Sequence, residues 1–514
     1  MRKKLPIGIQ TFREIREEGY YYVDKTRFVA KLAEEGKYYF LARPRRFGKS
    51  LFLDTLAEAF AANRALFEGL DLACRWDWSR PYPIIRISFA EGGFASRDEL
   101  DERIQDILDA NAARLGVTAT ARTIAGRFGD LITKAAAKHG ARAVVLVDEY
   151  DKPMLDNLTV PETARALRDG LRDFYSVLKA QDAHLRFVFL TGVSKFSKVS
   201  LFSGLNNLYD LTLDPDYATL CGYTENEVEG TFAPELDGLA RADIRRWYNG
   251  YRWLGEPVYN PYDLLLLFRT RDFRAWWFET GTPTFLVEWL KARRLFTPQL
   301  ERMFGDDELL SAFDVDVIRP EALLWQTGYL TIRERERVGG RDAYWLSVPN
   351  QEVRSALNRA LLTAWLPDAA AAMQSGLNLH RALAMGDVEA LRRHIERLYA
   401  GIPHDWYRSN PIAQYEGYYA GVFYSYLAAL GFDMTAEDVS QHGQCDLAVR
   451  VGSQVYLFEF KVVDGDAPTG AALAQLQARD YAAKYRAPEA TIWLIGVEFS
   501  RSRRQVVGWQ CAAD

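Results

Sequence analysis

The stretch Tyr38–Phe60 constrains the fold more strongly than any other part of this 514-residue chain. Five residues that read as a buried strand, Tyr38–Ala42, precede a short loop that ends in Gly48-Lys49-Ser50. Apolar residues then recur at helical spacing, which predicts a helix with one buried face from about Lys49. A strand, a loop and a helix in this order, with Gly-Lys-Ser at the helix start, are typical of a phosphate-binding loop.

The chemistry of this loop is specific. Backbone N–H groups and the helix dipole favour an anion at the helix start. Lys49 is expected to reach the β- and γ-phosphates of a nucleotide, and the Ser50 hydroxyl to ligate Mg²⁺. The match has one departure, because Arg43 stands where the pattern has its first glycine. Gly-Lys-Ser also occurs by chance, so the prediction of phosphate binding depends on further features of the chain.

A second feature lies about a hundred residues further on. The apolar run Ala143–Val147 ends in Asp148-Glu149, which predicts a buried parallel strand with two carboxylates at its tip. We expect Asp148 to lie near Mg²⁺ and Glu149 to orient an attacking water. A polar strand end that caps a helix is the alternative. Thr191 or Ser194, at the tip of the next strand, is a candidate sensor of the γ-phosphate or an ordinary strand-end hydroxyl.

Strands and helices alternate through this half of the chain, which predicts an α/β fold of the nucleotide-hydrolase type with a parallel sheet and helices on both faces. The further expected strands are 84–89, 185–190 and 208–213, and the expected helices are 97–115, 121–138 and 162–180.

The middle of the chain is mainly helical and rich in aromatic residues. Residues 325–332 and 343–348 are interpreted as a hairpin whose charged tip is Arg333–Arg337, within a winged-helix-like module. Such a hairpin either contacts DNA or is simply solvated. Residues 363–410 are interpreted as a helical linker that ends near Gly401-Ile402-Pro403.

A third feature is a predicted hairpin near the C-terminus. If Gly452-Ser453 is its two-residue turn, Asp446 and Glu459 lie opposite each other, and Lys461 shares their face. Two carboxylates that bind Mg²⁺ and a lysine that helps to form the attacking hydroxide are typical of a metal-dependent nuclease. An exposed salt bridge is the alternative, although the apolar neighbours of Glu459 predict a strand buried on both faces. Glu416, on the preceding helix, is a candidate accessory carboxylate.

Composition limits the partners and the compartment. The net charge is −5, so any contact with nucleic acid depends on local basic patches. The four cysteines show no metal-binding spacing, which favours a reducing cytoplasmic setting. No apolar run is long enough for a membrane span, and no signal peptide is expected.

The motifs together resemble a family that joins an AAA-like ATPase domain to a C-terminal PD-(D/E)XK nuclease-superfamily domain. The resemblance rests on RPRRFGKSLFLDTL, VVLVDEYDKPM, YNGYRW, WQTGYLTI and YLFEFKV, which follow in family order. It implies that Arg43 is the family's own variant of the loop. It implies nucleotide binding by Gly48, Lys49 and Ser50, and Mg²⁺ or hydrolysis roles for Asp148 and Glu149. It also implies nuclease roles for Asp446, Glu459 and Lys461, with Gln475 as a helix glutamine of that site. With the neighbouring residues included, the expected nucleotide-binding residues are Arg46, Phe47, Gly48, Lys49, Ser50, Leu51, Asp148 and Thr191, and the expected metal ligands are Ser50, Asp148, Asp446 and Glu459. Cys445 is a departure, since an arginine is expected there.

The resulting expectation is an ATP-binding, ATP-hydrolysing protein whose nuclease-like domain cleaves DNA or RNA with Mg²⁺. The expected domains are 1–222 (ATPase), 223–362 (helical, winged-helix-like), 363–410 (linker) and 411–514 (nuclease-like). One rival is a nucleotide-dependent switch or scaffold that binds a partner without cutting. Another is an active nuclease beside an ATPase that barely turns over. A homo-oligomer remains open, and no arginine is assigned to reach a neighbouring subunit's site.

Overall fold

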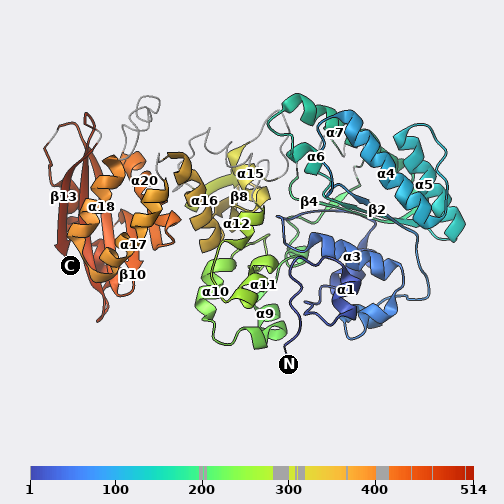
Figure 1. Cartoon of the computed structure of the whole chain (residues 1–514), viewed down its shortest axis with the longest axis horizontal. Coiled ribbons are helices and arrows are strands. Elements are labelled where there is room, and N and C mark those ends of the chain that lie inside the picture. The colour runs from blue at the N-terminus through green and yellow to red at the C-terminus, as the bar shows by residue number, and fades with distance from the viewer. Residues whose placement is uncertain are drawn as a thin grey trace. The chain divides into compact units, whose positions relative to one another are not determined.

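The chain forms two compact units in a computed structural model, drawn in Figure 1. The first unit contains Met1–Gly281 and Met303–Asn350, and the second contains Thr282–Arg302 and Gln351–Asp514. The structure describes residues 2–195, 201, 205, 207–281, 300–306, 310, 319–365, 369–400, 416–440, 443–465, 467–503 and 505–514.

A five-stranded parallel sheet organises the first unit, as predicted. Its order is β2 (Ile84–Ser88), β3 (Ala143–Asp148), β4 (Leu185–Gly192), β1 (Tyr38–Ala42) and β5 (Tyr209–Asp210). Every residue of β1 is buried, which explains its continuous apolar run. Because all strands point the same way, the loop after β1 and the carboxylates after β3 lie at one edge, with β4 between their strands.

Helices cover both faces of this sheet (Figure 1). On one face are α1 (Phe12–Glu17) and α3 (Lys49–Phe60); on the other are α4 (Arg97–Leu115), α5 (Ile124–His139) and α7 (Pro161–Ala180). Shorter elements connect them: α2 (Arg27–Glu35), α6 (Lys152–Leu155) and the 3₁₀ turns η1 (Arg64–Phe67), η2 (Asp71–Cys74), η3 (Asp182–His184) and η4 (Pro215–Tyr217). The α/β fold class is therefore confirmed.

The middle region belongs to the same unit. It contains α9 (Glu225–Thr231), η5 (Ala233–Glu235), α10 (Arg241–Tyr248), α11 (Pro261–Thr270), α12 (Trp276–Gly281), α15 (Pro320–Thr327) and a small sheet in the order β6 (Met303–Asp306), β8 (Arg341–Ser347), β7 (Thr331–Val338). Thr224 and Glu227 form a capping box that fixes the start of α9. A hydrophobic cluster joins α9, α10 and α11 to Tyr21 and Val23 near the N-terminus.

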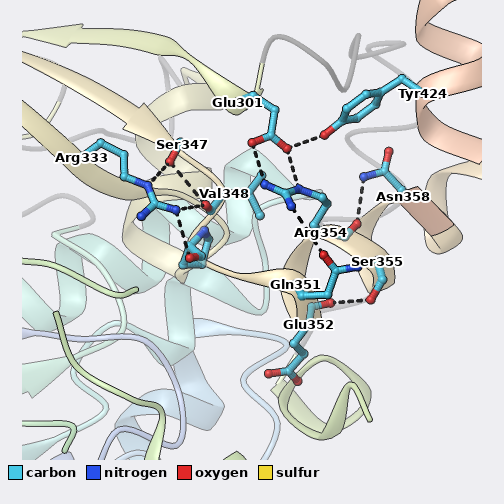
Figure 2. Close-up of polar contacts among 11 residues, drawn as sticks. Glu301, Arg333, Ser347, Val348, Gln351, Glu352, Arg354, Ser355, Asn358 and Tyr424 are labelled. Atoms are coloured by element: carbon cyan, nitrogen blue, oxygen red, sulfur yellow. Dashed lines mark hydrogen bonds and ion pairs between the residues drawn. The ribbon is translucent and has the colours of Figure 1, made fainter. Parts of the chain in front are cut away.

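The predicted hairpin exists in this region, but its predicted tip is wrong. Gly339 and Gly340 form the turn, with φ values of 59° and 84° that suit a two-residue hairpin. The charged segment Arg333–Arg337 lies inside β7. Figure 2 shows the reason for Arg333: its guanidinium donates to the Ser347 hydroxyl at 2.6 Å and to the Val348 carbonyl oxygen at 3.0 Å, along the neighbouring chain segment.

The second unit is built on a mixed five-stranded sheet. Its order is β13 (Val506–Ala513), β12 (Thr491–Ser500), β11 (Gln454–Val463), β10 (Gly443–Val451) and β9 (Asp433–Ser440). Only the β11–β12 pair is parallel among these described strands. One face packs on α17 (Ala369–Met385), α18 (Val388–Ala400) and α20 (Glu416–Ala429), and the other on α21 (Ala471–Arg479) and η8 (Tyr481–Tyr485).

The segment predicted as a linker contributes to this core. Leu379 and Leu383 of α17, and Leu391 and Ile395 of α18, are buried in one cluster with β10, β11 and β12. The predicted boundary at 410, and the Gly401–Pro403 segment near it, lie outside the described residues, so the domain limits stay predictions. None of the helices that the structure describes has the length and apolar character needed to cross a membrane.

A partly buried ion pair connects the first residues described in the second unit to its helices (Figure 2). Arg354, on α16 (Gln351–Trp365), donates from Nε and Nη2 to the two carboxylate oxygens of Glu301 at 2.8 and 3.0 Å. The Tyr424 hydroxyl, on α20, also donates to Glu301. Bidentate pairs of this kind are strong and directional, so residues 300–301 are anchored to both helices despite their distance in sequence.

Candidate functional site

A cavity of about 490 Å³ lies at the edge of the first sheet where the phosphate-binding loop and the strand β3 end. Its wall includes the predicted nucleotide-binding residues Arg46, Phe47, Gly48, Lys49, Ser50, Leu51 and Asp148, together with Glu149. This volume is in the range of ordinary small-molecule pockets. The structure therefore brings these eight residues to one hollow, while their binding roles stay predictions.

Lys49 is buried against its own loop. Its ammonium group donates to the carbonyl oxygens of Arg43 and Pro44, both at 2.9 Å. Burial lowers the pKa of Lys49, and the nearby Asp148 and Glu149 carboxylates oppose this effect. The cation is therefore kept in place by backbone dipoles that a phosphate oxygen could replace.

Ser50 and Asp148 make direct contact. The Ser50 hydroxyl donates to Asp148 Oδ2 at 2.6 Å, which links the start of α3 to the tip of β3. Burial raises the pKa of Asp148, and the bond from Ser50 partly opposes this. A hydroxyl and a carboxylate are the hard oxygen ligands that Mg²⁺ takes beside nucleotide phosphates, so the donor set fits that ion.

Glu149 has an unusual backbone conformation. Its φ of 53° lies in the left-handed region, which non-glycine residues adopt mainly where the surrounding structure imposes it. Burial raises the pKa of its carboxyl group, while the charges of Lys49 and Arg45 lower it. Glu149 thus points a poorly solvated carboxyl group at the same hollow as Lys49.

Arg43, the residue at the missing glycine, is a structural part of the loop. It is fully buried, and its guanidinium donates to the carbonyl oxygens of Ala42, Thr212 and Tyr217 at 2.9, 3.0 and 3.3 Å. It also lies 4.2 Å from the ring centroid of Trp253, as a cation–π contact. The hydrogen bonds of the Arg43 side chain therefore hold the start of this loop, where the usual pattern has a glycine.

The hydroxyl groups of both candidate γ-phosphate sensors, Thr191 and Ser194, form hydrogen bonds within the protein. The buried Thr191 hydroxyl donates to the Leu41 carbonyl oxygen at 3.0 Å, and Thr191 is not among the residues that line the cavity. The Ser194 hydroxyl donates to Asp151 Oδ2 at 2.6 Å. Their sensor role stays a prediction, and these contacts do not support it.

Several cavity residues were not predicted from the sequence. Among them are Lys25, Arg45, Cys221, Tyr223 and Tyr262. Lys25 donates to Glu227 and to the Thr219 carbonyl oxygen at 2.7 Å. Arg45 could have been found, because it belongs to the basic loop, whereas the others come from separate segments with no local motif.

The second candidate site lies on the hairpin of β10 and β11. Its register is the predicted one, with Val451 opposite Gln454 and Leu447 opposite Phe458. Gly452 begins the two-residue turn with a φ of 61°. Asp446 and Glu459 are the next residues beyond the last of these pairs, so the two carboxylates lie at one end of the ladder.

The Glu459 side chain is buried, with 2% of its surface exposed. Its Oε1 accepts from the Gln475 amide and lies 3.4 Å from Lys461 Nζ. Asp446 Oδ2 accepts from the Phe460 backbone N–H at 2.7 Å. Burial first, and then the charge of Asp446, raise the pKa of Glu459 to about 7.

This arrangement fits a divalent cation. Glu459 Oε2 is buried and has no hydrogen-bond partner, beside a second carboxylate. Such a group is costly to bury unless something compensates its charge. Among the described residues there is no cluster of three or more His, Cys, Asp or Glu side chains, so two carboxylates would be the core of the ligand set.

Two other residues were singled out near this site, Cys445 and Glu416, and the structure describes the side chain of Cys445 alone. Cys445 is fully buried in the hydrophobic cluster under α21, and burial raises its pKa to about 12. It therefore packs the core where an arginine was expected. Glu416 begins α20, but its side chain lies outside the described part of the chain.

Comparison with known proteins matches the N-terminal and the C-terminal parts of the chain to two different families. A family described as predicted AAA-ATPase matches residues 6–202, and the PD-(D/E)XK nuclease superfamily matches residues 414–509. The chain is 58% identical over 509 residues to a protein of Azotobacter chroococcum mcd 1 called "Uncharacterized protein in vnfD 5'region", covering 99% of this chain and 98% of that one.

The chain belongs to the family in which a predicted AAA-ATPase domain precedes a C-terminal PD-(D/E)XK nuclease-superfamily domain. A solved structure, "Structure of Drosophila ORC bound to AT-rich DNA and Cdc6", also matches 68% of this chain and 91% of its own, at 13% identity. Its TM-score of 0.19 is too low to support an argument.

Proposed function

We propose that this protein binds and hydrolyses ATP and uses the nucleotide to control a Mg²⁺-dependent nuclease that acts on nucleic acid. The observation that carries the proposal is that one chain assembles two complete sets of groups. The first set is Lys49, Ser50, Asp148 and Glu149 at one cavity; the second is Asp446, Glu459, Lys461 and Gln475 on one hairpin and its covering helix.

In the first set, each residue has a role that its position supports. Lys49 would exchange the carbonyl oxygens of Arg43 and Pro44 for phosphate oxygens. Ser50 and Asp148 would hold Mg²⁺, which neutralises charge on the phosphates when bound. Glu149, whose raised pKa suits a proton acceptor, would orient the attacking water.

In the second set, Asp446 and Glu459 would hold the cation, which activates a water and stabilises charge on the phosphate when bound. The buried Glu459 carboxylate is oriented by Gln475 through its other oxygen. Lys461, next to Glu459, would hold the attacking hydroxide or the scissile phosphate. This donor set suits a phosphodiester, which makes DNA or RNA the proposed substrate.

A cleavage assay on the full-length protein tests this proposal. Labelled single- and double-stranded DNA and RNA are incubated with Mg²⁺ or Mn²⁺, with Glu459→Ala beside the wild type. Glu489→Ala is the matched control, because Glu489 is an exposed glutamate before β12. We expect cutting by the wild type and the control, and none by Glu459→Ala.

Two outcomes would contradict the proposal. Cutting that survives Glu459→Ala would place the activity elsewhere. Binding of nucleic acid without cutting under any metal condition would favour the switch or scaffold, in which the nuclease-like domain only holds a partner.

A further inference from the structure

Besides the buried Arg43, the predicted phosphate-binding loop contains two further arginines, Arg45 and Arg46, where glycine-rich loops present mainly backbone N–H groups. Both line the cavity together with Lys49, Asp148 and Glu149. The loop is therefore a source of cations as well as of backbone donors. Hydrolysis of a nucleoside triphosphate needs such cations, because negative charge spreads over the transferred phosphoryl group and the leaving oxygen.

The two arginines are directed differently. Arg46 has a φ of 68°, is exposed, and its guanidinium lies 4.9 Å from the ring centroid of Tyr262 on α11. Arg45 is only partly exposed and lines the same cavity as Glu149. Because the Arg46 guanidinium lies over the Tyr262 ring, Arg45 is the loop arginine better placed to act on a ligand in the cavity.

The backbone at Arg45 is fixed by the middle region. The indole N–H of Trp277, on α12, donates to the Arg45 carbonyl oxygen at 3.0 Å, and Trp277 is fully buried. The preceding residue, Pro44, is packed against Gly328. A Cβ atom at Gly328 would lie 2.8 Å from the Pro44 ring, and its φ of 93° also requires glycine.

We propose that Arg45 supplies, from within the same chain, the arginine that stabilises the transition state of nucleotide hydrolysis, and that Trp277 positions it. This inference rests on the proposed ATPase function. Water attacks the γ-phosphorus, the bond to the β–γ bridging oxygen breaks, and ADP and phosphate leave. Glu149 accepts the proton of the water, and the Arg45 guanidinium lies against the γ-phosphoryl oxygens as their charge develops.

The consequence is that hydrolysis does not depend on a neighbouring subunit. An arginine delivered by a second copy would make turnover per protein fall on dilution, as the copies separate. An arginine on the loop itself would leave turnover per protein constant.

The experiment measures ATP binding and steady-state hydrolysis with the full-length wild type, Arg45→Ala, Arg45→Lys and Trp277→Phe. Arg80→Ala serves as the matched control, because Arg80 is an exposed arginine outside the cavity. We expect Arg45→Ala to bind ATP within about threefold of the wild type and to lose at least about 100-fold in kcat. Arg45→Lys should retain part of the rate, since it keeps the charge without the planar fork.

Trp277→Phe tests the positioning role. It keeps a buried aromatic ring, but it removes the indole N–H that donates to the Arg45 carbonyl oxygen, together with part of the ring volume. We expect about a tenfold lower kcat with KM within about threefold, which a general loss of folded protein would not produce once the active fraction is measured by ATP binding.

The outcomes separate this inference from the proposed function. If the wild type neither binds nor hydrolyses ATP, the proposed function fails and the inference fails with it. If the wild type hydrolyses ATP and Arg45→Ala is equally active, only the inference is overturned. Turnover per protein that falls on dilution, through a range in which the oligomeric state changes, would also overturn it.

Discussion

The two candidate sites differ in how their buried charged side chains are hydrogen-bonded. In the cavity of the first unit, Lys49 is held by two carbonyl oxygens and Asp148 by the Ser50 hydroxyl. In the second unit, Glu459 is buried with one oxygen unpartnered, and its pKa is raised to about 7. The first site satisfies its polar groups internally, whereas the second leaves one unsatisfied.

This difference indicates how each site would respond to its ligand. A bound nucleotide would have to displace the internal hydrogen bonds of Lys49 and Ser50. A cation at Glu459 would need no such displacement at Oε2, and it would relieve the cost of burying that carboxylate. This contrast is consistent with the proposed control by nucleotide at the first site and the proposed chemistry at the second.

The largest expected effect concerns the second site. Asp446→Ala removes one of two carboxylates, so we expect cleavage to fall by at least about 1,000-fold, or ~4 kcal/mol in activation free energy, with ATP hydrolysis unchanged. A gel assay and a phosphate-release assay measure the two activities. Asp433→Ala, a partly exposed aspartate on β9, is the control. Cleavage that persists in Asp446→Ala would remove the nuclease assignment.

A second variant measures how much the hydrogen bonds of Arg43 contribute to stability. Arg43→Gly restores the usual glycine but leaves three carbonyl oxygens without their donor. We expect it to lower the free energy of unfolding of the first unit by about 3 kcal/mol, measured by chemical denaturation. A variant as stable as the wild type would show that the guanidinium contacts contribute little.

Lys49→Ala should mainly affect affinity. The ammonium group is a buried cation in the wall of the cavity, and its loss should weaken ATP binding by about 100-fold, or ~2.7 kcal/mol. Titration calorimetry with ATP and Mg²⁺ measures this, with Lys138→Ala on the exposed end of α5 as control. An unchanged affinity would remove the ATP assignment.

The smallest effect is one of pH and stability. Because the pKa of Glu459 is raised to about 7 in the folded state, its protonated form is favoured there, and this stability is present below the ordinary pKa of 4.5 and is lost as the pH rises through about 7. Glu459→Gln should therefore stabilise the metal-free protein by about 2 kcal/mol at pH 8 and much less at pH 5. Unfolding curves at both pH values measure it, and equal effects at both would contradict the assigned cause.

Strands with a continuous apolar pattern could be predicted from the sequence. Tyr38–Ala42 matches β1 residue for residue, and the C-terminal hairpin has its predicted register. In both cases a local signal, either an apolar run or a Gly-X turn, determines the structure. The sequence did not predict the edge strands β9 and β13, because β9 is mostly polar, and Gly508 and Gln510 interrupt the apolar run of β13.

The other features that the sequence did not predict depend on residues outside the local motif. The run of charges at Arg333–Arg337 predicts a hairpin tip, whereas Gly339-Gly340 forms the turn. The anchoring of Arg43 depends on Thr212 and Tyr217, which are far away in the sequence. The candidate carboxylates were found because each lies next to its own motif, whereas Arg45 acquires its significance only from the contact with Trp277.

The most direct test of the account is the dependence of cleavage on ATP in the wild type and in Lys49→Ala. Both proteins are assayed with Mg²⁺ on the same labelled nucleic acid, with and without ATP. The account predicts that ATP changes the cleavage rate of the wild type and leaves that of Lys49→Ala unchanged. A cleavage rate that is the same with and without ATP in the wild type would contradict control of the nuclease by the nucleotide.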